Sequence, residues 1–480
     1  MKSKIRISFL YKPVLLGLCF CLIFISSGHA VQDATWLSHV GVRKLSIPDV
    51  TFLANDYGAI QDGKTLNTLA IQRAIDSCAI QGGGKVVFAK GRYLTGSIYL
   101  KSNVELHIGE GVELIGSQHL SDYPEIQTRV AGVEMKWPSA LINIIAQRNA
   151  AVTGAGVIDG QGKPFWDAYR ALREDYEGKQ LRWIVDYDAK RPRTLLVDSS
   201  WDILIEDVTF RRAGFWTVHI LYSSYVTVDG IIVQNNIGGH GPSTDGIDID
   251  SSSWILVQNA DIDCNDDNFC IKSGRDWDGL RINRPTEYVL IQNCLSRRGG
   301  GLITFGSETS GGMRHIIARN LRAKGTKVGI RFKSATNRGG IIENIKLQNI
   351  LLDSVGVAID INSDWHRSYS YSVLPEGYER SKLPDHWIKM LEPILPAERG
   401  IPTFRNIEIS GLQAKNVRVA IKAKGLESSP LDHFQLRDVV IYADQAGSVN
   451  YAKNWSIDNV SIKAQDGTNP KVTNSEGVTF

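Results

Sequence analysis

The stretch Ile203-Leu-Ile205-Glu-Asp207-Val208-Thr-Phe210 decides the fold, and its pattern returns in Val226-Thr-Val228-Asp-Gly230-Ile231-Ile-Val233 and in Ile255-Leu-Val257-Gln-Asn259-Ala260-Asp-Ile262. In each copy, apolar residues alternate with other residues on both sides of an Asp, Gly or Asn. Alternation with a period of two is typical of β-strands. Because Asp, Gly and Asn tolerate a left-handed backbone, each copy is predicted to bend at that residue.

Later copies of the pattern continue the series and make the chain a repeat. Most steps between bends are 21 to 34 residues long, and the later bends are expected at Asn293, Asn320, Asn349, Gly411, Asp438 and Asn459. Short strands at this period, without helices between them, predict an all-β solenoid, a parallel β-helix. A β-sandwich is the alternative, but it would not reproduce the same bend in every unit.

A second strand recurs in each coil and places charge on one face. In strands such as Gly246-Ile-Asp-Ile-Asp250 and Asn268-Phe-Cys-Ile-Lys272, the apolar residues share one parity and are predicted to fill the core. The opposite parity is predicted to face outward. We therefore expect a charged strip along one sheet, formed by Asp248, Asp250, Lys272, Arg331 and Lys333, with His219 also pointing out.

Three segments depart from the repeat. Residues 65–80 carry Leu69, Ile71, Ala74, Ile75 and Cys78 at helical spacing, which predicts an amphipathic helix that caps the open N-terminal end. Residues 163–193 and 365–402 are long interruptions with many aromatic residues. We expect them to be loop insertions that wall the charged strip, with simple edge decoration as the alternative.

Composition and the N-terminal segment bear on the cellular location. The chain has 480 residues, 22% of them charged, and a formal charge of +3. Residues 1–30 hold four basic residues and no acid around an apolar run, ending in Gly28 and Ala30, which is typical of a signal peptide; a membrane anchor is the alternative. The remainder, residues 31–480, carries about −1 and is predicted to be a single catalytic domain, secreted or periplasmic, with no nucleic-acid partner and no membrane attachment after signal cleavage.

The cysteines of the body do not form a metal-site or disulfide-framework pattern. Cys78, Cys264, Cys270 and Cys294 remain after the predicted cleavage. Cys264 and Cys270 could form a bridge, or all four could be buried free thiols.

Carboxylates gather at the start of the charged strip. Aligning the second strands by their core residues places Asp245 and Asp267 at equivalent positions on adjacent coils, about 4.8 Å apart, with Asp266 beside them. Like charges this close raise at least one pKa. The cluster suits paired acid and base catalysis or calcium binding, and a purely structural role in turns is the remaining alternative.

These residues resemble a known family. Ser243-Thr-Asp-Gly, Asn265-Asp-Asp and Arg331-Phe-Lys, in this order, resemble the signature blocks of the polygalacturonases, the family 28 glycoside hydrolases. Asp56-Tyr-Gly-Ala and Gly96-Ser-Ile-Tyr-Leu-Lys-Ser-Asn-Val-Glu-Leu are also similar to the family. The resemblance spans roughly residues 50 to 465. It implies a right-handed parallel β-helix that hydrolyses α-linked galacturonic-acid-containing glycans with inversion.

The resemblance also implies roles for individual residues. Asp266 is expected to be the general acid, and Asp245 and Asp267 the pair that holds and deprotonates the attacking water. Inversion needs room for that water, so the acid and base are predicted to stand about 6.5–9.5 Å apart. Arg331 and Lys333 are expected to hold the uronate carboxylate. Mutual ion pairing of these cations with Asp248 or Asp250 is the alternative.

One departure from the family concerns a histidine. The family normally has Gly-His-Gly on the third coil, and here the histidine position falls on Gly300. His219 or His240 could compensate, and a substrate other than plain polygalacturonate is then favoured. The loop that begins Lys272-Ser-Gly-Arg275 resembles exo-acting bacterial members, so Lys272 and Arg275 are counted among the expected substrate-binding residues and a closed pocket is favoured.

Two other functions stay open at this point. A pectate lyase-like β-eliminase would place Ca²⁺ on the acidic cluster, and a glycan-binding β-helix would have no catalytic role. The hydrolase interpretation predicts no cofactor, no metal, a pectic oligosaccharide or polysaccharide as partner, and a monomer.

Overall fold

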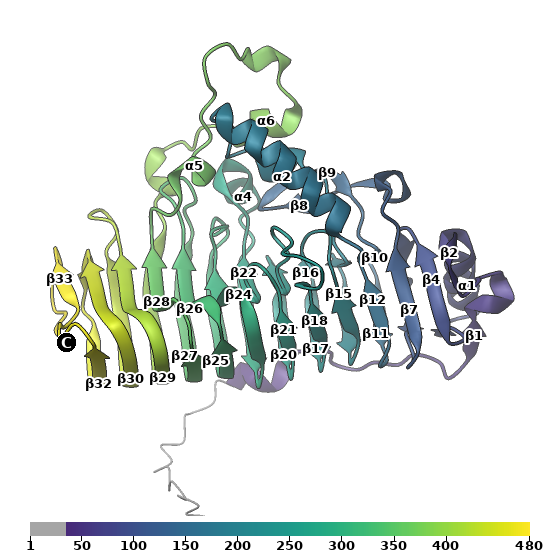
Figure 1. The fold of residues 1–480 in the computed structure, drawn as a ribbon, viewed down its shortest axis with the longest axis horizontal. Helices are drawn as coiled ribbons and strands as arrows, with labels where there is room; N and C mark the ends of the chain where they lie inside the picture. Colours follow the sequence, from purple (N-terminus) through teal and green to yellow (C-terminus); the bar gives the residue numbers. More distant parts are fainter. Residues whose placement is uncertain (1–34) are drawn as a thin grey trace, which may run out of the picture. The chain divides into compact units, whose positions relative to one another are not determined.

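Parallel strands wound into a solenoid make up most of the chain (Figure 1). The computed structural model describes residues 35–480, and the predicted signal segment, residues 1–30, lies outside the described residues. A 31-stranded sheet contains nearly every strand, and its neighbouring strands are parallel. The predicted all-β parallel β-helix is confirmed.

Each coil contributes strands to three rows. The first row contains β1 (Thr51–Leu53), β3 (Gly84–Val87), β6 (Val104–His107), β11 (Arg148–Thr153), β14 (Trp201–Glu206), β17 (Ser224–Asp229), β20 (Ser253–Gln258), β23 (Thr286–Gln292), β25 (Met313–Lys324), β27 (Ile341–Asp353), β29 (Thr403–Lys424), β30 (Leu431–Asn450) and β32 (Ser456–Ala464). The second row contains β2 (Asp62–Leu66), β4 (Gly91–Thr95), β7 (Val112–Gly116), β12 (Val157–Asp159), β15 (Thr209–Arg211), β18 (Ile232–Gln234) and β21 (Asp261–Asp263).

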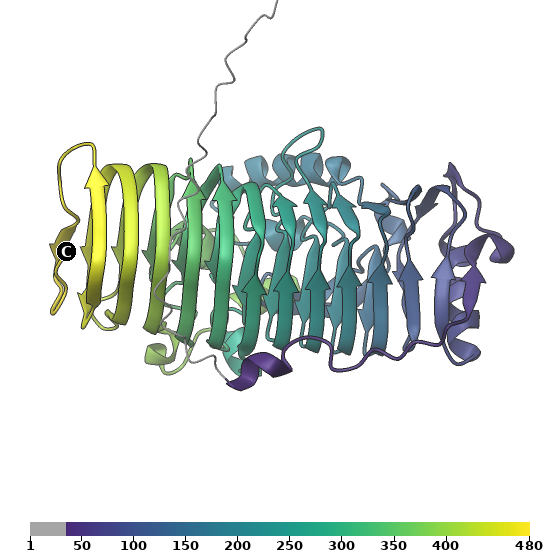
Figure 2. The same cartoon turned by 90° about the horizontal axis from the view of Figure 1, so that it is seen from below.

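The third row carries the predicted charged strip. It contains β5 (Ile98–Tyr99), β10 (Ile142–Ile145), β13 (Leu195–Asp198), β16 (Val218–Leu221), β19 (Ile247–Asp250), β22 (Phe269–Lys272), β24 (Leu295–Phe305), β26 (Thr326–Lys333), β28 (Val357–Asn362) and β33 (Lys471–Thr473). Toward the C-terminal end the strands lengthen and pass through more than one row, as β24, β25, β29 and β30 do (Figure 2). The short β31 (Ala452–Lys453) pairs with β30.

The predicted bends have the left-handed backbone that the pattern requires. All nine bend residues have positive φ, from 51° at Asn459 to 66° at Gly230. Asparagine amides also bond from coil to coil, as Asn320 Nδ2 does to Asn293 Oδ1 at 3.1 Å. At Gly411 a Cβ would lie 2.7 Å from Asn349 Oδ1, so that step of the ladder leaves no room for a side chain.

The interior of the coils is filled by stacked apolar side chains. Ile247, Ile249, Phe269 and Ile271 are buried, as their parity predicts. Phe305 stacks on Phe332 of the next coil with ring centroids 4.5 Å apart. Each such side chain stabilises the fold by about 1.5–3 kcal/mol through burial, so the register of the coils is strongly specified.

Helix α1 (Thr68–Ile80) packs against β3, β5 and β6 at the N-terminal end of the solenoid. Ile71, Ala74, Ile75 and Cys78 are buried as expected, but Leu69 is 75% exposed, contrary to its place in the predicted apolar face. Successive helical residues are about 100° apart, and the neighbouring Ala70 takes the inward direction in the first turn.

The two insertions and a hairpin build a layer above the third row (Figure 1). The hairpin pairs β8 (Glu125–Val130) with β9 (Val133–Pro138) in antiparallel fashion. The first insertion forms α2 (Lys163–Gly178) and α3 (Val185–Asp188), and the second forms α5 (Arg367–Ser370), η4 (Arg380–Lys382), α6 (Asp385–Met390) and η5 (Ala397–Gly400). Helix α4 (Asp276–Ile282) follows β22, and the 3₁₀ turns η1 (Thr35–His39), η2 (Ala54–Tyr57) and η3 (Leu120–Asp122) lie elsewhere.

This layer has a hydrophobic core of its own. Trp137 of the hairpin, Trp183 of the first insertion and Trp387 of the second belong to one buried cluster with Trp216, which leads into β16. The charged strip lies beneath this layer and is therefore mostly buried: Asp248, Asp250 and His219 have no exposed surface. Their side chains point away from the solenoid core, as predicted, but they do not reach solvent.

The four cysteines of the described residues are free and buried, so the possible Cys264–Cys270 bridge is not formed. No helix within residues 35–480 combines the length and the apolar character needed to cross a membrane.

Candidate active site

The strand register brings the candidate carboxylates together. In the pairing of β19 with β22, Ile247 lies opposite Phe269, and the Gly246 amide donates to the Asp267 carbonyl at 3.0 Å. Asp245 and Asp267, each two residues before these partners, therefore occupy equivalent positions on adjacent coils. Oxygens of Asp245, Asp266 and Asp267 lie within 4.8 Å of one another.

The separation of acid and base differs from the predicted 6.5–9.5 Å. Asp266 and Asp267 are consecutive residues in one bend, and the Asp267 amide donates to Asp266 Oδ1 at 3.0 Å. Oxygens of the two carboxylates lie within 4.8 Å of each other, closer than the predicted range. Room for a water must therefore come from the pocket side of the cluster.

Two cations clamp Asp267. Lys333 Nζ donates to Asp267 Oδ2 at 2.8 Å, and Arg331 Nη1 donates to Oδ1 at 3.1 Å. Burial alone would raise the pKa of Asp267, but the two cations hold that pKa well below its usual range. The cations thus pair with Asp267 rather than with Asp248 or Asp250; Asp250 instead accepts from Arg129 at 2.8 Å.

Asp266 has the opposite electrostatic environment. Burial and the negative charge of Asp267 raise its pKa, while Lys333 and Arg331 act in the other direction more weakly. A carboxyl group that keeps its proton beside an ionised neighbour can serve as a general acid, and the pair divides the two roles as acid–base catalysis requires.

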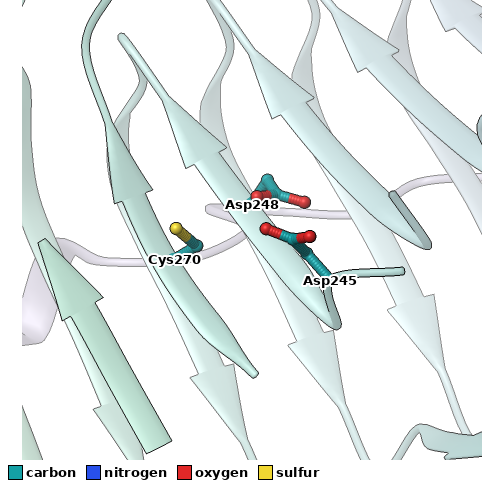
Figure 3. A group of neighbouring side chains, drawn as sticks. All are labelled: Asp245, Asp248 and Cys270. Carbon is teal, nitrogen blue, oxygen red and sulfur yellow. The ribbon is translucent and has the colours of Figure 1, made fainter. Parts of the chain in front are cut away.

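Beside Asp245 lies a fourth carboxyl, Asp248, with the thiol of Cys270 close by (Figure 3). Burial raises the pKa of Asp248 to about 8, and burial followed by the charge of Asp248 raises the pKa of Asp245 well above its usual range. Lys272 Nζ lies 3.5 Å from Asp248 Oδ1 and 3.8 Å from Asp245 Oδ2. Two carboxyls and a thiol at this spacing could hold a cation, and the ammonium of Lys272 already supplies that positive charge.

A pocket of about 330 Å³ opens over the carboxylates. Its floor includes Asp245, Asp266, Asp267, Arg331 and Lys333, which the sequence placed in one site. Its walls come from the predicted insertions: Arg173, Arg182 and Asp186 from the first, and Trp365, His366 and Tyr369 from the second. The expectation that both insertions wall the strip thus matches the lining of the pocket.

Three of the expected substrate-binding residues lie outside this lining. His219 is buried, and its Nδ1 accepts from Arg193 at 2.7 Å; burial lowers its pKa to about 4. His240 is exposed and pairs with Asn236 Oδ1 at 3.0 Å. Neither histidine is among the residues that line the pocket.

Arg275 also lies away from the pocket. Its guanidinium has no exposed surface and donates to Tyr187 Oη at 2.8 Å and to the Ser370 carbonyl at 3.2 Å. It therefore joins the first insertion to the second. Lys272 does line the pocket, but only 4% of its surface is exposed.

Gly300 lies directly beside Asp266 and Asp267. A Cβ on this residue would lie 3.0 Å from Asp267 Oδ1 and 3.1 Å from Asp266 Oδ1. The alignment that assigned the missing histidine to this position is consistent with its place in space. Gly300 is itself buried, so a side chain at this position would press on both carboxylates.

Other pocket residues were missed by sequence reasoning. Glu308, 3.3 Å from Lys272 Nζ, ends the segment that placed the missing histidine at Gly300, and Trp216, whose ring centroid lies 4.5 Å from that Nζ, begins a strand of the predicted repeat. Arg182 and Tyr369 lie within the recognised insertions, but nothing in a single sequence indicates which insertion residues turn inward. Ala131 comes from the hairpin β8–β9, whose alternating pattern could have been found.

A larger groove of about 730 Å³ lies on another face, over β25, β27, β29 and β30. It is lined by residues such as Leu351, Gln413 and Tyr442 and brings no group of three carboxylates together. The smaller pocket is therefore the candidate active site on chemical grounds.

Comparison with known proteins agrees with this geometry. The model of the glycosyl hydrolases family 28 matches residues 78–374, and the chain belongs to this family. It is thus a glycosidase related to the polygalacturonases.

The relatives carry related names. The chain is 27% identical to "Probable polygalacturonase" of Vitis vinifera, over 81% of this chain and 73% of that protein. It is 25% identical to "Exo-poly-alpha-D-galacturonosidase" of Dickeya chrysanthemi, over 75% of this chain and 64% of that protein. Among solved structures, the exopolygalacturonase of Thermotoga maritima is 27% identical, with a TM-score of 0.72 over 89% of this chain and 94% of that one.

Proposed function

We propose that the protein is an inverting, exo-acting hydrolase of α-linked galacturonic-acid-containing pectic glycans. The observation that carries this proposal is the pairing of a three-carboxylate cluster with two cations on the floor of one walled pocket. A cationic pair beside an acidic cluster suits a ligand that brings its own negative charge.

The roles follow from the two environments of the acid pair. Asp266, whose pKa is raised, donates its proton to the glycosidic oxygen as the bond from C1 to that oxygen breaks. A water held between Asp245 and Asp267 attacks C1 from the opposite face, and Asp267, the ionised carboxylate, accepts the proton of the water. Attack opposite the departing oxygen inverts the anomeric configuration.

Substrate binding would also change the pKa of Asp267, the proposed base. Arg331 and Lys333 both donate to Asp267. A uronate carboxylate that enters takes over part of this donation, so the pKa of Asp267 rises toward the range of an effective base. A neutral sugar would leave Asp267 fully paired and weakly basic, and this gives the site a preference for uronides.

The walls support action on chain ends. Trp365 and Tyr369 stand on the side of the second insertion, and Arg182 stands on the side of the first. An internal segment of a polysaccharide needs a groove with two open ends, whereas a walled pocket accepts one terminus. The exo-acting relatives are consistent with this mode.

Product analysis on a panel of pectic oligosaccharides tests the substrate and the mode together. We expect monouronate as the first product, with substrates shortened by one residue at each step. Mixed oligomers as first products would contradict the exo mode. Proton NMR of the first product, recorded before mutarotation, should show inverted configuration, and retained configuration would contradict the mechanism.

Two controls separate the other functions. A calcium-dependent lyase would lose activity in chelator and give an unsaturated product that absorbs in the ultraviolet, whereas the hydrolase should do neither. Asp266→Asn should abolish turnover while oligogalacturonate binding persists; binding by the wild type without any turnover would leave only the glycan-binding function.

Export and a monomeric state complete the proposal. The signal-like character of residues 1–30 supports a secreted or periplasmic location, with no membrane attachment after cleavage and no nucleic-acid partner. Cell fractionation with N-terminal sequencing should find a product that begins near residue 31. Light scattering on the purified protein should give the mass of one chain.

A further inference from the structure

Lys272 has a position that substrate binding does not explain. Its Nζ lies 3.3 Å from Glu308 Oε2, 3.5 Å from Asp248 Oδ1 and 3.8 Å from Asp245 Oδ2, above the ring of Trp216. The side chain is almost wholly buried and faces a carboxylate on three sides. Three carboxylates thus lie at ion-pair distance from this one cation, so its charge acts on all three.

The three carboxyl groups around Lys272, from Asp245, Asp248 and Glu308, could carry more negative charge than its one ammonium balances. Asp248 is fully buried, and neither of its oxygens accepts a hydrogen bond from a donor in residues 35–480. Its carboxyl lies beside that of Asp245 (Figure 3). Two buried carboxyls side by side are stable when they share one proton, because a single ammonium cannot balance three buried charges.

We propose that Lys272 and Glu308 are positioning residues that set the protonation of the Asp245–Asp248 pair, which shares one proton, and thereby set the pH above which Asp245 presents an ionised oxygen to the attacking water. This inference rests on the proposed hydrolase function and deepens it. Lys272 favours the ionised form of Asp245, and Glu308 opposes that effect by competing for the same ammonium.

Several other charged groups lie near Asp245 and also affect its pKa. Asp266 and Asp267 lie on the next coil, with Lys333 and Arg331 beyond them. The remaining titratable groups near Asp245 come from Cys270 and from the first insertion. Gly300 lies next to Asp266 and Asp267 and, because it has no side chain, adds no titrating group there. The groups that interact with Asp245 are Asp248, Asp266, Lys272, Asp267, Cys270, Cys264 and Arg191, and Glu308 acts on it through Lys272, 3.3 Å away.

The two proposed positioning residues predict shifts of opposite sign. In Lys272→Met the loss of the ammonium raises the pKa of Asp245, so the acidic limb of the kcat/KM profile moves to higher pH, by about one unit or more. In Glu308→Gln the same limb moves to lower pH. Lys272→Arg keeps the charge and should keep the limb near its wild-type place.

The experiment is a pH profile of oligogalacturonate hydrolysis for these variants and for Lys85→Met, a matched control. Lys85 pairs with Glu105 at 3.1 Å in the first row of strands, and its removal should leave the limb in place. A loss of activity by the same factor at every pH in Lys272→Met, or a rise of KM alone, would overturn the proposal. If Lys272→Met does not fold, Glu308→Gln decides, because an unmoved or raised limb contradicts the predicted sign.

A second readout separates this proposal from the proposed function. Infrared difference spectra of the carboxyl band across pH 4–9 follow protonation without any substrate. A midpoint that rises in Lys272→Met and falls in Glu308→Gln supports the proposal even if the wild-type protein hydrolyses no pectic substrate. Identical midpoints in the three proteins would refute it whatever the activity.

Discussion

Removing Lys333 tests the link between binding and catalysis most directly. Its Nζ donates to Asp267 Oδ2 at 2.8 Å, and it is one of only two cations that hydrogen-bond to this carboxylate among the described residues. A hydrogen bond between charged groups contributes about 1.5–3 kcal/mol, and 1.36 kcal/mol corresponds to one pKa unit. Lys333→Met should therefore raise the pKa of Asp267 by about one to two units.

The sign of the pH effect follows from this shift. Asp267 serves as the base only when ionised, so in Lys333→Met its own step on the acidic side of the profile should move to higher pH by this amount, while the step assigned to Asp245 stays in place. The uronate loses one charge-assisted contact as well, and kcat/KM at the new optimum should fall about 10- to 150-fold. Steady-state release of reducing sugar from trigalacturonate between pH 3 and 9 measures both effects.

A matched control and a refuting outcome make the test sharp. Lys346→Met removes a lysine on β27 that pairs with Glu408 at 3.9 Å, away from the pocket, and should leave the profile unchanged. If Lys333→Met lowers kcat/KM equally at all pH values, Lys333 contacts substrate without acting on Asp267, and the coupling between binding and base strength is refuted.

The ion pair also affects stability. The pKa of Asp267 is lower in the folded protein than in the unfolded chain, so its ionisation stabilises the fold at pH above about 4. This contribution is lost as the pH falls through the depressed folded value. In urea titrations, Lys333→Met should therefore be destabilised relative to wild type at pH 7, and the difference should shrink in strong acid.

Three further outcomes follow from single contacts. Arg275→Met removes one of the two buried arginines that pair with Asp276, together with the hydrogen bonds to Tyr187 and the Ser370 carbonyl, and should lower the free energy of unfolding by about 1.5–3 kcal/mol in urea titrations, whereas no measurable change would contradict its structural role. Gly300→Ala places a methyl group 3.0 Å from Asp267 Oδ1 and should lower kcat with little change in the thermal midpoint; unchanged kcat would show that this side of the acid pair is not used. The buried thiols, Cys264 included, should react with a thiol reagent only after denaturation, and fast reaction in the native state would contradict their burial.

The sequence predicted those features that local physics determines. Each bend depends on the residue that adopts positive φ, and Asn, Asp and Gly report that preference in the chain itself; all nine positions have it. The equivalence of Asp245 and Asp267 followed from the same source, because a solenoid turns a repeat in sequence into a stack in space. The carboxylate cluster could therefore be predicted from the order of residues alone.

Features that depend on packing between distant segments could not be predicted in this way. The burial of His219 and Asp248 depends on the hairpin β8–β9 and on two insertions, one of which comes more than 100 residues after them in the chain. Leu69 fits an apolar helical face by spacing, yet Ala70 takes the inward position. In both cases the direction of a side chain is set by a partner element that periodicity does not reveal.

The covering layer is also what gives the strip its chemistry. On an open solenoid face, the same carboxylates would be solvated, would titrate near their ordinary pKa values and would differ little from one another. Beneath a layer of tryptophans, burial strengthens every interaction between charges, and small differences in neighbours separate Asp266 from Asp267. The repeat thus supplies the spacing of the acids, while the insertions supply the exclusion of water that separates the pKa values of two adjacent aspartates.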